Sequence, residues 1–211
     1  LLRLGSNRWW LVEKNTKENP MDYLPYLYLS RLNIILGQYD PKSSYYDVAL
    51  EHSMKALEIA PKFVRTYYEV AQAYFYKKDF PHAIEFFQKA VDLNPGAGIS
   101  HAYLGAAKIE SGDLSGAKDL ERAITSKNPY KPGKTDFQRF VNAYLKLNDF
   151  SHIAWIYEQM IKENPDNPQH YASLATAYAN LGRIDDAVIL ARKAVQVDPS
   201  FEPKAKVFLK S

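Results

Sequence analysis

The chain has 211 residues and a formal net charge of +3, and 46% of its residues are hydrophobic. That hydrophobic content suffices for a packed core, whereas 27 basic against 24 acidic residues is too even a balance for a protein that binds a phosphate backbone through clustered cations. The absence of cysteine excludes disulfides and thiolate metal sites, and no uncharged apolar run is long enough to span a membrane.

The chain begins with a lead-in, residues 1–21, that shows no repeat pattern but contains a predicted helix around residues 9–12. It opens on Leu1-Leu2-Arg3-Leu4, without a methionine and without the charged and apolar regions of a signal peptide. We expect both ends to be cut from a longer protein.

Prolines recur along the rest of the chain at almost one spacing: Pro61, Pro95, Pro129, Pro165 and Pro199. The intervals between them are 34, 34, 36 and 34 residues. A repeat near 34 residues is the period of a helix–turn–helix solenoid, in which each unit packs on its neighbours. The array is therefore predicted in residues 22–199, with a capping helix in residues 200–211. Its five helix pairs are predicted in residues 22–61, 64–95, 98–129, 134–165 and 168–199.

The first copy contains an insertion between its two helices. The core positions of its first helix are Tyr26, Leu29, Ser30 and Asn33. Those of its second helix are Ala49, Ser53 and Ala56. We expect the first helix to end at Gly37, because glycine is typical of a helix C-terminus. Residues 38–44 then form a longer turn than in the other copies.

The second copy has the clearest pattern. Its first helix is predicted from Tyr67, Val70, Ala71 and Tyr74. Its second helix is predicted from Ala83, Phe87 and Ala90. Small residues let helix axes approach closely, and the aromatic residues fill the gaps between them. Asp79 stands where it can cap the second helix.

The third and fourth copies depart from this pattern. The second helix of the third copy is one residue short between Ala117 and Ala123. In the fourth copy the bulky Ile153 and Met160 replace small residues, and two extra residues lie in the loop 130–133. We expect the array to be least regular between these copies, with this loop mobile.

The fifth copy returns to the small-residue pattern, with Ala187, Ala191 and Ala194 in its second helix. A final helix is predicted from residue 201 to residue 209. Its apolar stripe should cover the end of the core, as terminal repeats of solenoids do.

The order of aromatic, small and proline positions resembles the tetratricopeptide repeat (TPR) family over residues 22–199. The resemblance implies an all-α fold, an α-α superhelix of about five helix-turn-helix repeats with terminal capping helices. The aromatic residues at the repeat positions are then core residues and not site residues.

Two short strings, residues 36–41 and 198–201, are similar to the soluble C-terminal TPR regions of bacterial O-antigen ligase-like membrane proteins. This resemblance implies a soluble domain, cytoplasmic or tethered in a bacterium to an upstream membrane part that carries glycan-transfer chemistry.

TPR proteins use the concave groove lined by their first helices to bind ligands. The residues between core positions that this resemblance places there include Leu27, Ile34, Ile99, Ala102, Ala106, Ile109, Leu145, Gln169, Ala172 and Asn180. The residues predicted to contact the ligand are Arg31, Arg65, Tyr68, Gln72, Phe75, Tyr76, Gln138, Asn142 and Thr176. Amides can bind an extended peptide backbone and the aromatic residues can accept apolar side chains, so we expect a protein or peptide ligand.

The groove is predicted to centre on Tyr68, Gln72 and Phe75, with Gln138 and Asn142 opposite. Tyr68 and Phe75 are expected to have no role in folding. The alternative is that these residues cover an unused solenoid surface or pack on another part of the full protein.

Chaperone-binding TPR domains hold a C-terminal carboxylate with a set of Lys, Asn, Lys and Arg on adjacent first helices. Where the leading Lys and Asn should stand, this chain has Tyr68 and Gln72, or Ala102 and Ala106. We therefore do not expect a heat-shock chaperone tail as the ligand.

Other chemistry has little support. The five histidines are scattered over different repeats and are expected on the surface: His52, His82, His101, His152 and His170. His82 and His152 occupy matching places two repeats apart, and neither has a carboxylate or second histidine at metal spacing. Glu85, Asp92 and Glu158 are typical of solvated helix faces, and there is no Gly-rich phosphate loop. We expect no cofactor, no metal, no nucleic acid partner and no catalytic role in this region.

Three functions remain open at this point. A protein- or peptide-binding scaffold is favoured. The second is a regulatory or assembly appendage of a membrane-bound glycan ligase or polymerase, and the third is an RNA-binding helical repeat.

Overall fold

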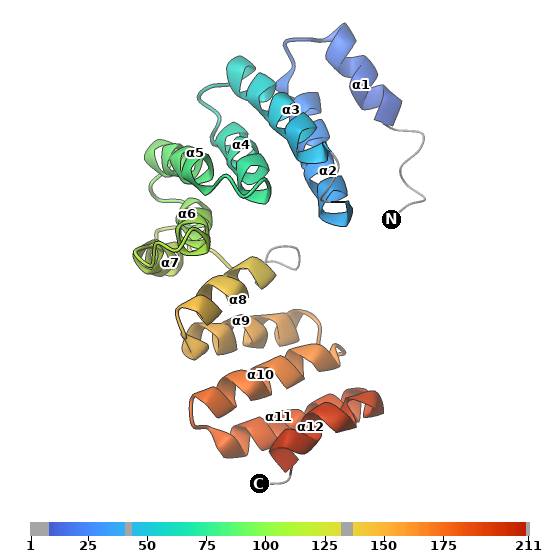
Figure 1. The fold of residues 1–211 in the computed structure, drawn as a ribbon, viewed down its shortest axis with the longest axis vertical. Coiled ribbons are helices and arrows are strands. Elements are labelled where there is room, and N and C mark those ends of the chain that lie inside the picture. Colours follow the sequence, from blue (N-terminus) through green and yellow to red (C-terminus); the bar gives the residue numbers. More distant parts are fainter. Residues whose placement is uncertain (1–8, 41–43, 132–136, 210–211) are drawn as a thin grey trace. The chain divides into compact units, whose positions relative to one another are not determined.

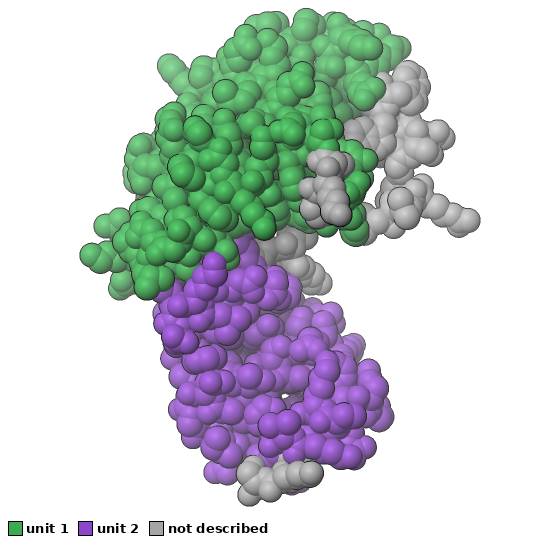
Figure 2. Space-filling model, viewed as in Figure 1, with its two compact units in different colours: residues 1–130 green, residues 131–211 purple. Residues whose placement is uncertain are grey.

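The computed structural model describes residues 9–40, 44–131 and 137–209, and within these ranges the chain is helical without a strand. A single isolated bridge, parallel, joins Ala97 and Asn128. Residues 132–136, which include part of the loop predicted to be mobile, lie outside the described residues. The chain divides into two compact units, residues 1–130 and 131–211 (Figure 2).

The first unit holds α1 and three helix pairs (Figure 1). Its helices are α1 (Trp9–Glu18), α2 (Tyr23–Tyr39), α3 (Tyr45–Ile59), α4 (Val64–Tyr76), α5 (Phe80–Leu93), α6 (Gly98–Glu110) and α7 (Gly116–Thr125). The second unit holds two pairs and the terminal helices. They are α8 (Phe137–Lys146), α9 (Phe150–Glu163), α10 (Pro168–Asn180), α11 (Ile184–Val197), a 3₁₀ turn (Pro199–Phe201) and α12 (Glu202–Leu209). Each pair lies within one predicted repeat.

Four of the pairs turn through the same local structure. One residue in each turn has a positive φ: Lys78, Gly112, Asn148 and Gly182. The backbone N–H of the next residue donates to the carbonyl oxygen five residues earlier, as that of Asp79 does to Tyr74 at 3.0 Å. The Asp79 carboxylate then accepts from the backbone N–H of His82, which confirms the predicted cap of α5.

Gly37 does not end the first helix, contrary to expectation, because α2 continues to Tyr39. The glycine instead permits close packing. A Cβ at Gly37 would lie 2.5 Å from the ring of Tyr46 in α3, so the absence of a side chain lets that ring lie against α2.

Small residues lie at the helix contacts of the second pair. Ala71, Ala83 and Ala90 are fully buried, as is Phe87. In the second unit Ile153 and Met160 are also buried, so bulky residues at these positions still belong to the core. Around α11, Ala187 and Ala191 pack with Ala205 of α12 in one apolar cluster, as expected of a capping helix.

Replacing Ala83 by leucine is expected to lower the free energy of unfolding by ~1–3 kcal/mol, because a fully packed contact must open to admit three more carbons. Urea denaturation followed by circular dichroism measures the change. Ala117→Leu, at a partly exposed site on α7, is the control and should cost less. An unchanged midpoint for Ala83→Leu would contradict the close-packing explanation.

Candidate ligand-binding surface

The predicted ligand residues divide between the two units. Arg31 lies on α2, and five lie on α4: Arg65, Tyr68, Gln72, Phe75 and Tyr76. In the second unit, Gln138 and Asn142 of α8 are exposed, and the Gln138 amide donates to the Asn142 Oδ1 at 3.0 Å. Thr176 of α10 is exposed, and its hydroxyl donates to the carbonyl of Ala172 at 3.1 Å.

Arg31 and Arg65 meet at a buried carboxylate that the sequence prediction missed. The Glu69 Oε1 lies 3.5 Å from the Arg31 Nη2 and 3.8 Å from the Arg65 Nε. The Glu69 side chain is only 2% exposed, whereas the two arginine side chains are 52% and 46% exposed. We call these three residues the charged cluster. The only sequence signal for Glu69 was its position one turn after Arg65, as the single acidic residue of α4.

Burial dominates the electrostatics of Glu69. Its pKa is raised because the loss of water outweighs the attraction of Arg31 and Arg65 for the ionised form. Its Oε2 is also buried and has no hydrogen-bond partner among the described residues. The ionised Glu69 carboxylate therefore holds two guanidinium groups in place, but its burial lowers the free energy of unfolding.

The raised pKa predicts how stability depends on pH. Because the folded pKa lies above the ordinary value of 4.5, the folded chain binds this proton more tightly than the unfolded chain. The contribution of Glu69 to the free energy of unfolding should therefore fall as pH rises from about 4.5 through the raised pKa. Glu69→Gln lacks this titration, so its stability relative to wild type should increase with pH in denaturation series from pH 4 to pH 8.

Glu85→Gln is the matched control for this series. The exposed Glu85 accepts a hydrogen bond from the Lys89 Nζ at 2.6 Å, which lowers its pKa, so the variant should lose stability relative to wild type as pH rises. If Glu69→Gln behaved like this control, the two arginines would outweigh burial.

Tyr68 and Phe75 do pack within the fold, so the prediction that they have no folding role is wrong. The Tyr68 hydroxyl is hydrogen-bonded to that of Ser100, and its ring centroid lies 6.0 Å from that of Tyr103 on α6. Phe75 makes an edge contact with Phe80 of α5 at 5.6 Å. These rings link α4 to α5 and α6 because α4 lies between neighbouring helices and has few open positions.

Tyr76 is likewise packed. Its ring stacks on that of Tyr46 at 5.8 Å and lies against the buried cluster of Ile34, Ala49 and Ala73. Gln72 is half-buried, and Arg31 and Arg65 remain the most open members of the predicted set in this unit.

Five further residues assigned to the concave face are buried: Leu27, Ile34, Ala102, Ala106 and Ile109. On α2, Ile34 packs with Ala73 of α4. Helix α6 is buried on almost every side because Tyr68, Phe87 and α7 all pack on it. The predicted exposure of these residues is therefore wrong. Ile99, Leu145, Gln169 and Asn180 are exposed as expected.

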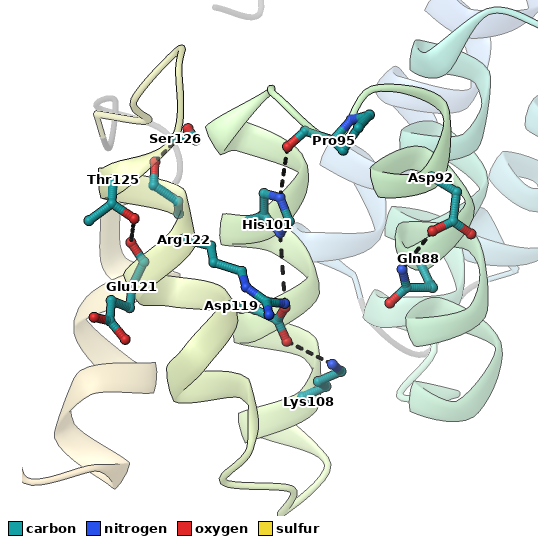
Figure 3. Close-up of polar contacts among 11 residues, drawn as sticks. Gln88, Asp92, Pro95, His101, Lys108, Asp119, Glu121, Arg122, Thr125 and Ser126 are labelled. Atoms are coloured by element: carbon teal, nitrogen blue, oxygen red, sulfur yellow. Dashed lines mark hydrogen bonds and ion pairs between the residues drawn. The ribbon is translucent and has the colours of Figure 1, made fainter.

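His101 and His170 are buried, contrary to the expectation of surface histidines. His101 Nε2 donates to the carbonyl oxygen of Pro95 at 3.0 Å, and its Nδ1 lies 3.9 Å from the Asp119 Oδ1 (Figure 3). Asp119 is buried, and its Oδ2 accepts a hydrogen bond from the Lys108 Nζ at 2.7 Å. Figure 3 shows these groups joining α6, α7 and the loop after α5, which is a structural role.

Neither a metal cluster nor a membrane span was found in the described ranges. No group of three or more His, Cys, Asp or Glu residues there could hold a metal ion. No helix in those ranges is long and apolar enough to cross a membrane.

Residues 64–96 and 156–189 each match a tetratricopeptide repeat family model. Together with the helix pairs described above, these matches show that the chain contains tetratricopeptide repeats. The chain is 27% identical to Hsp70-Hsp90 organizing protein 3 of Arabidopsis thaliana over 125 residues. This matched stretch covers 59% of this chain and 20% of that protein. The chain is 35% identical to the Protein SGT1 homolog of Oryza sativa subsp. japonica over 66 residues, 31% of this chain and 18% of that one.

Two solved structures share the fold. Yeast Tom70 has a TM-score of 0.62 and 18% identity, covering 97% of this chain and 43% of that chain. YrrB, described as a TPR protein with an unusual peptide-binding site, has a TM-score of 0.56 and 19% identity, covering 95% of this chain and 98% of that chain. The chain spans about a fifth of the length of the curated relative from Arabidopsis. The comparisons lend no support to the O-antigen ligase resemblance, to a bacterial origin or to membrane tethering.

Proposed function

We propose that the chain is a scaffold that binds a protein or peptide partner through solvent-facing residues of its first helices, and that this region has no catalytic role. Its tetratricopeptide repeats and its 27% identity to a relative named an Hsp70-Hsp90 organizing protein support protein binding. Because the chain spans only 20% of that relative, the partner is argued from the residues of this chain.

The charged cluster is the observation that carries the proposal. Two half-exposed guanidinium groups are held beside one buried carboxylate, which leaves the cluster with one net positive charge. Guanidinium groups bind carboxylates through paired hydrogen bonds, and their fixed position lowers the entropy lost on binding. Gln72 lies two turns after Arg65 on the same side of α4 and can pair with a peptide backbone. These groups fit a peptide segment that carries an acidic side chain.

A chaperone C-terminal tail is not the partner we propose. Tyr68 and Gln72, or Ala102 and Ala106, stand where the leading Lys and Asn of the carboxylate-binding set would be. Ala102 and Ala106 are buried, and the Tyr68 hydroxyl is bound to Ser100. These positions therefore offer no cation to a terminal carboxylate.

Selection from a random peptide display library, followed by calorimetry with the selected peptides, tests the proposal. We expect acidic peptides, and an at least tenfold loss of affinity, about 1.4 kcal/mol, when the whole cluster is replaced by Arg31→Gln, Arg65→Gln and Glu69→Gln together. Replacing all three leaves no unpaired buried carboxylate, so the fold should survive, which circular dichroism checks.

Two controls accompany this triple variant. Glu69→Gln alone keeps both guanidinium groups and should bind the acidic peptides at least as tightly as wild type. Glu85→Gln with Lys89→Gln removes a charge pair from α5 and should leave affinity unchanged. Peptides that lose affinity only with the α5 variant would overturn the proposal, and tight binding of single-stranded RNA at physiological salt would favour an RNA-binding function instead.

A further inference from the structure

The outward side of α2 carries apolar residues where a surface helix usually carries charges. Leu24, Tyr28, Ile35 and Tyr39 have exposures from 43% to 82%, and Arg31 lies among them at 52%. Arg31 is also the one charged residue in the 17 residues of α2. We call these five residues the α2 stripe.

The five positions share one side of the helix. The first three spacings, of four, three and four residues, follow the heptad pattern of a helix–helix seam, and Tyr39 lies one turn after Ile35 on the same side. The opposite side of α2 is already used, since its buried residues include Leu29, Asn33 and Gly37. At a rise of ~1.5 Å per residue, the stripe is about 22 Å long, which matches a partner helix of about 15 residues.

We propose that the α2 stripe is a docking surface for an amphipathic helix of another protein. This incoming helix carries a carboxylate that lies opposite Arg31. The inference rests on the proposed scaffold function and names the form and chemistry of its partner. Large apolar side chains exposed together usually mark a contact surface. Apolar residues of the incoming helix would pack against Leu24, Tyr28, Ile35 and Tyr39, and the central guanidinium selects an acidic residue at mid-seam.

The position of Arg31 argues against a second copy of this chain as the occupant. A two-fold symmetric pairing of two α2 helices through the stripe would be antiparallel about its midpoint, between residues 31 and 32. Arg31 of each copy would then face Arg31 of the other, and like charges at the centre of an apolar seam oppose association. A partner with a carboxylate at that position removes this repulsion.

A matched set of synthetic helices tests the inference. Three 18-residue peptides would have leucine at the heptad seam positions and differ only at the central one, which is Glu, Gln or Lys. Titrated by fluorescence anisotropy below the concentration at which they self-associate, the Glu peptide should bind at least tenfold more tightly than the Lys peptide. Arg31→Glu combined with Glu69→Gln should reverse this order.

A stripe variant separates this inference from the scaffold proposal. Tyr28→Ser with Ile35→Ser should weaken binding of the Glu peptide at least tenfold. The control, Ile184→Ser with Ile189→Ser, removes apolar residues of similar exposure from α11 and should leave binding of this peptide unchanged. If only the triple glutamine variant of the charged cluster lost binding, the α2 inference would fail and the scaffold proposal would stand. If neither lost binding, both would fail.

Two further results would overturn the α2 inference. One is equal binding of the three peptides whatever their central residue. The other is a dimer of the chain in analytical ultracentrifugation that Tyr28→Ser with Ile35→Ser dissociates, since the stripe would then be covered by a second copy.

Discussion

Replacing Phe87 by alanine is expected to lower the free energy of unfolding by about 3–5 kcal/mol. The Phe87 side chain is fully buried in α5, and its ring stacks on that of Tyr103 in α6, with centroids 5.5 Å apart and planes 9° apart. Truncation removes the transfer free energy of the ring and leaves a cavity between two helix pairs that the alanines around it cannot fill. Urea denaturation followed by circular dichroism measures the loss.

Phe63→Ala is the control for this measurement, because the same atoms are removed where the ring is 41% exposed. Its cost should be less than half that of Phe87→Ala. Equal costs would contradict the argument that burial and the cavity left behind make the Phe87 ring more important for stability.

Replacing Gly98 by alanine is expected to cost about 3 kcal/mol, although alanine is the better helix former by ~1 kcal/mol. A Cβ at Gly98 would lie 2.3 Å from the Ala123 carbonyl oxygen, 2.6 Å from the Tyr130 nitrogen and 2.7 Å from the Asn128 carbonyl oxygen. All three are backbone atoms, so no side chain can rotate away. The start of α6 and the segment after α7 would have to separate, which breaks the 3.0 Å hydrogen bond from the Gly98 N–H to Asn128.

Gly96→Ala is the matched control, two residues earlier in the same loop. Its Cβ would come no closer than 3.9 Å to any atom outside its chain neighbours, so its effect should be within about 0.5 kcal/mol. Hydrogen exchange at the Gly98 and Tyr130 amides should accelerate in Gly98→Ala and not in the control. A stabilised Gly98→Ala protein would show that helix propensity outweighs the contact.

The same close packing bears on ligand binding. Tyr68 of α4 contacts Ser100 and Tyr103 of α6, so the backbone beneath the charged cluster is held by buried and half-buried side chains. Arg31 comes from α2 and Arg65 from α4, so a ligand on the cluster contacts two successive repeats. Substitutions in the aromatic contacts would change affinity by moving these helices and would therefore also change stability.

The repeat period, the helix pairs and the small residues at their contacts followed from the sequence alone. Ala83 and Ala90 are buried and Asp79 caps α5 as predicted, because these features depend on spacing within one repeat and on the chemistry of a single turn. Local signals of this kind survive in any arrangement of neighbouring helices.

Which side of each first helix remains open was decided only by the tertiary structure. Spacing says that residues share a face, but the neighbouring helices determine what packs on it. Ala102 and Ala106 are buried although their spacing placed them in the groove, while the apolar Ile35 and the aromatic Tyr28 are exposed. Glu69 became a site residue only because α2 brings Arg31 beside it in a position that water does not reach.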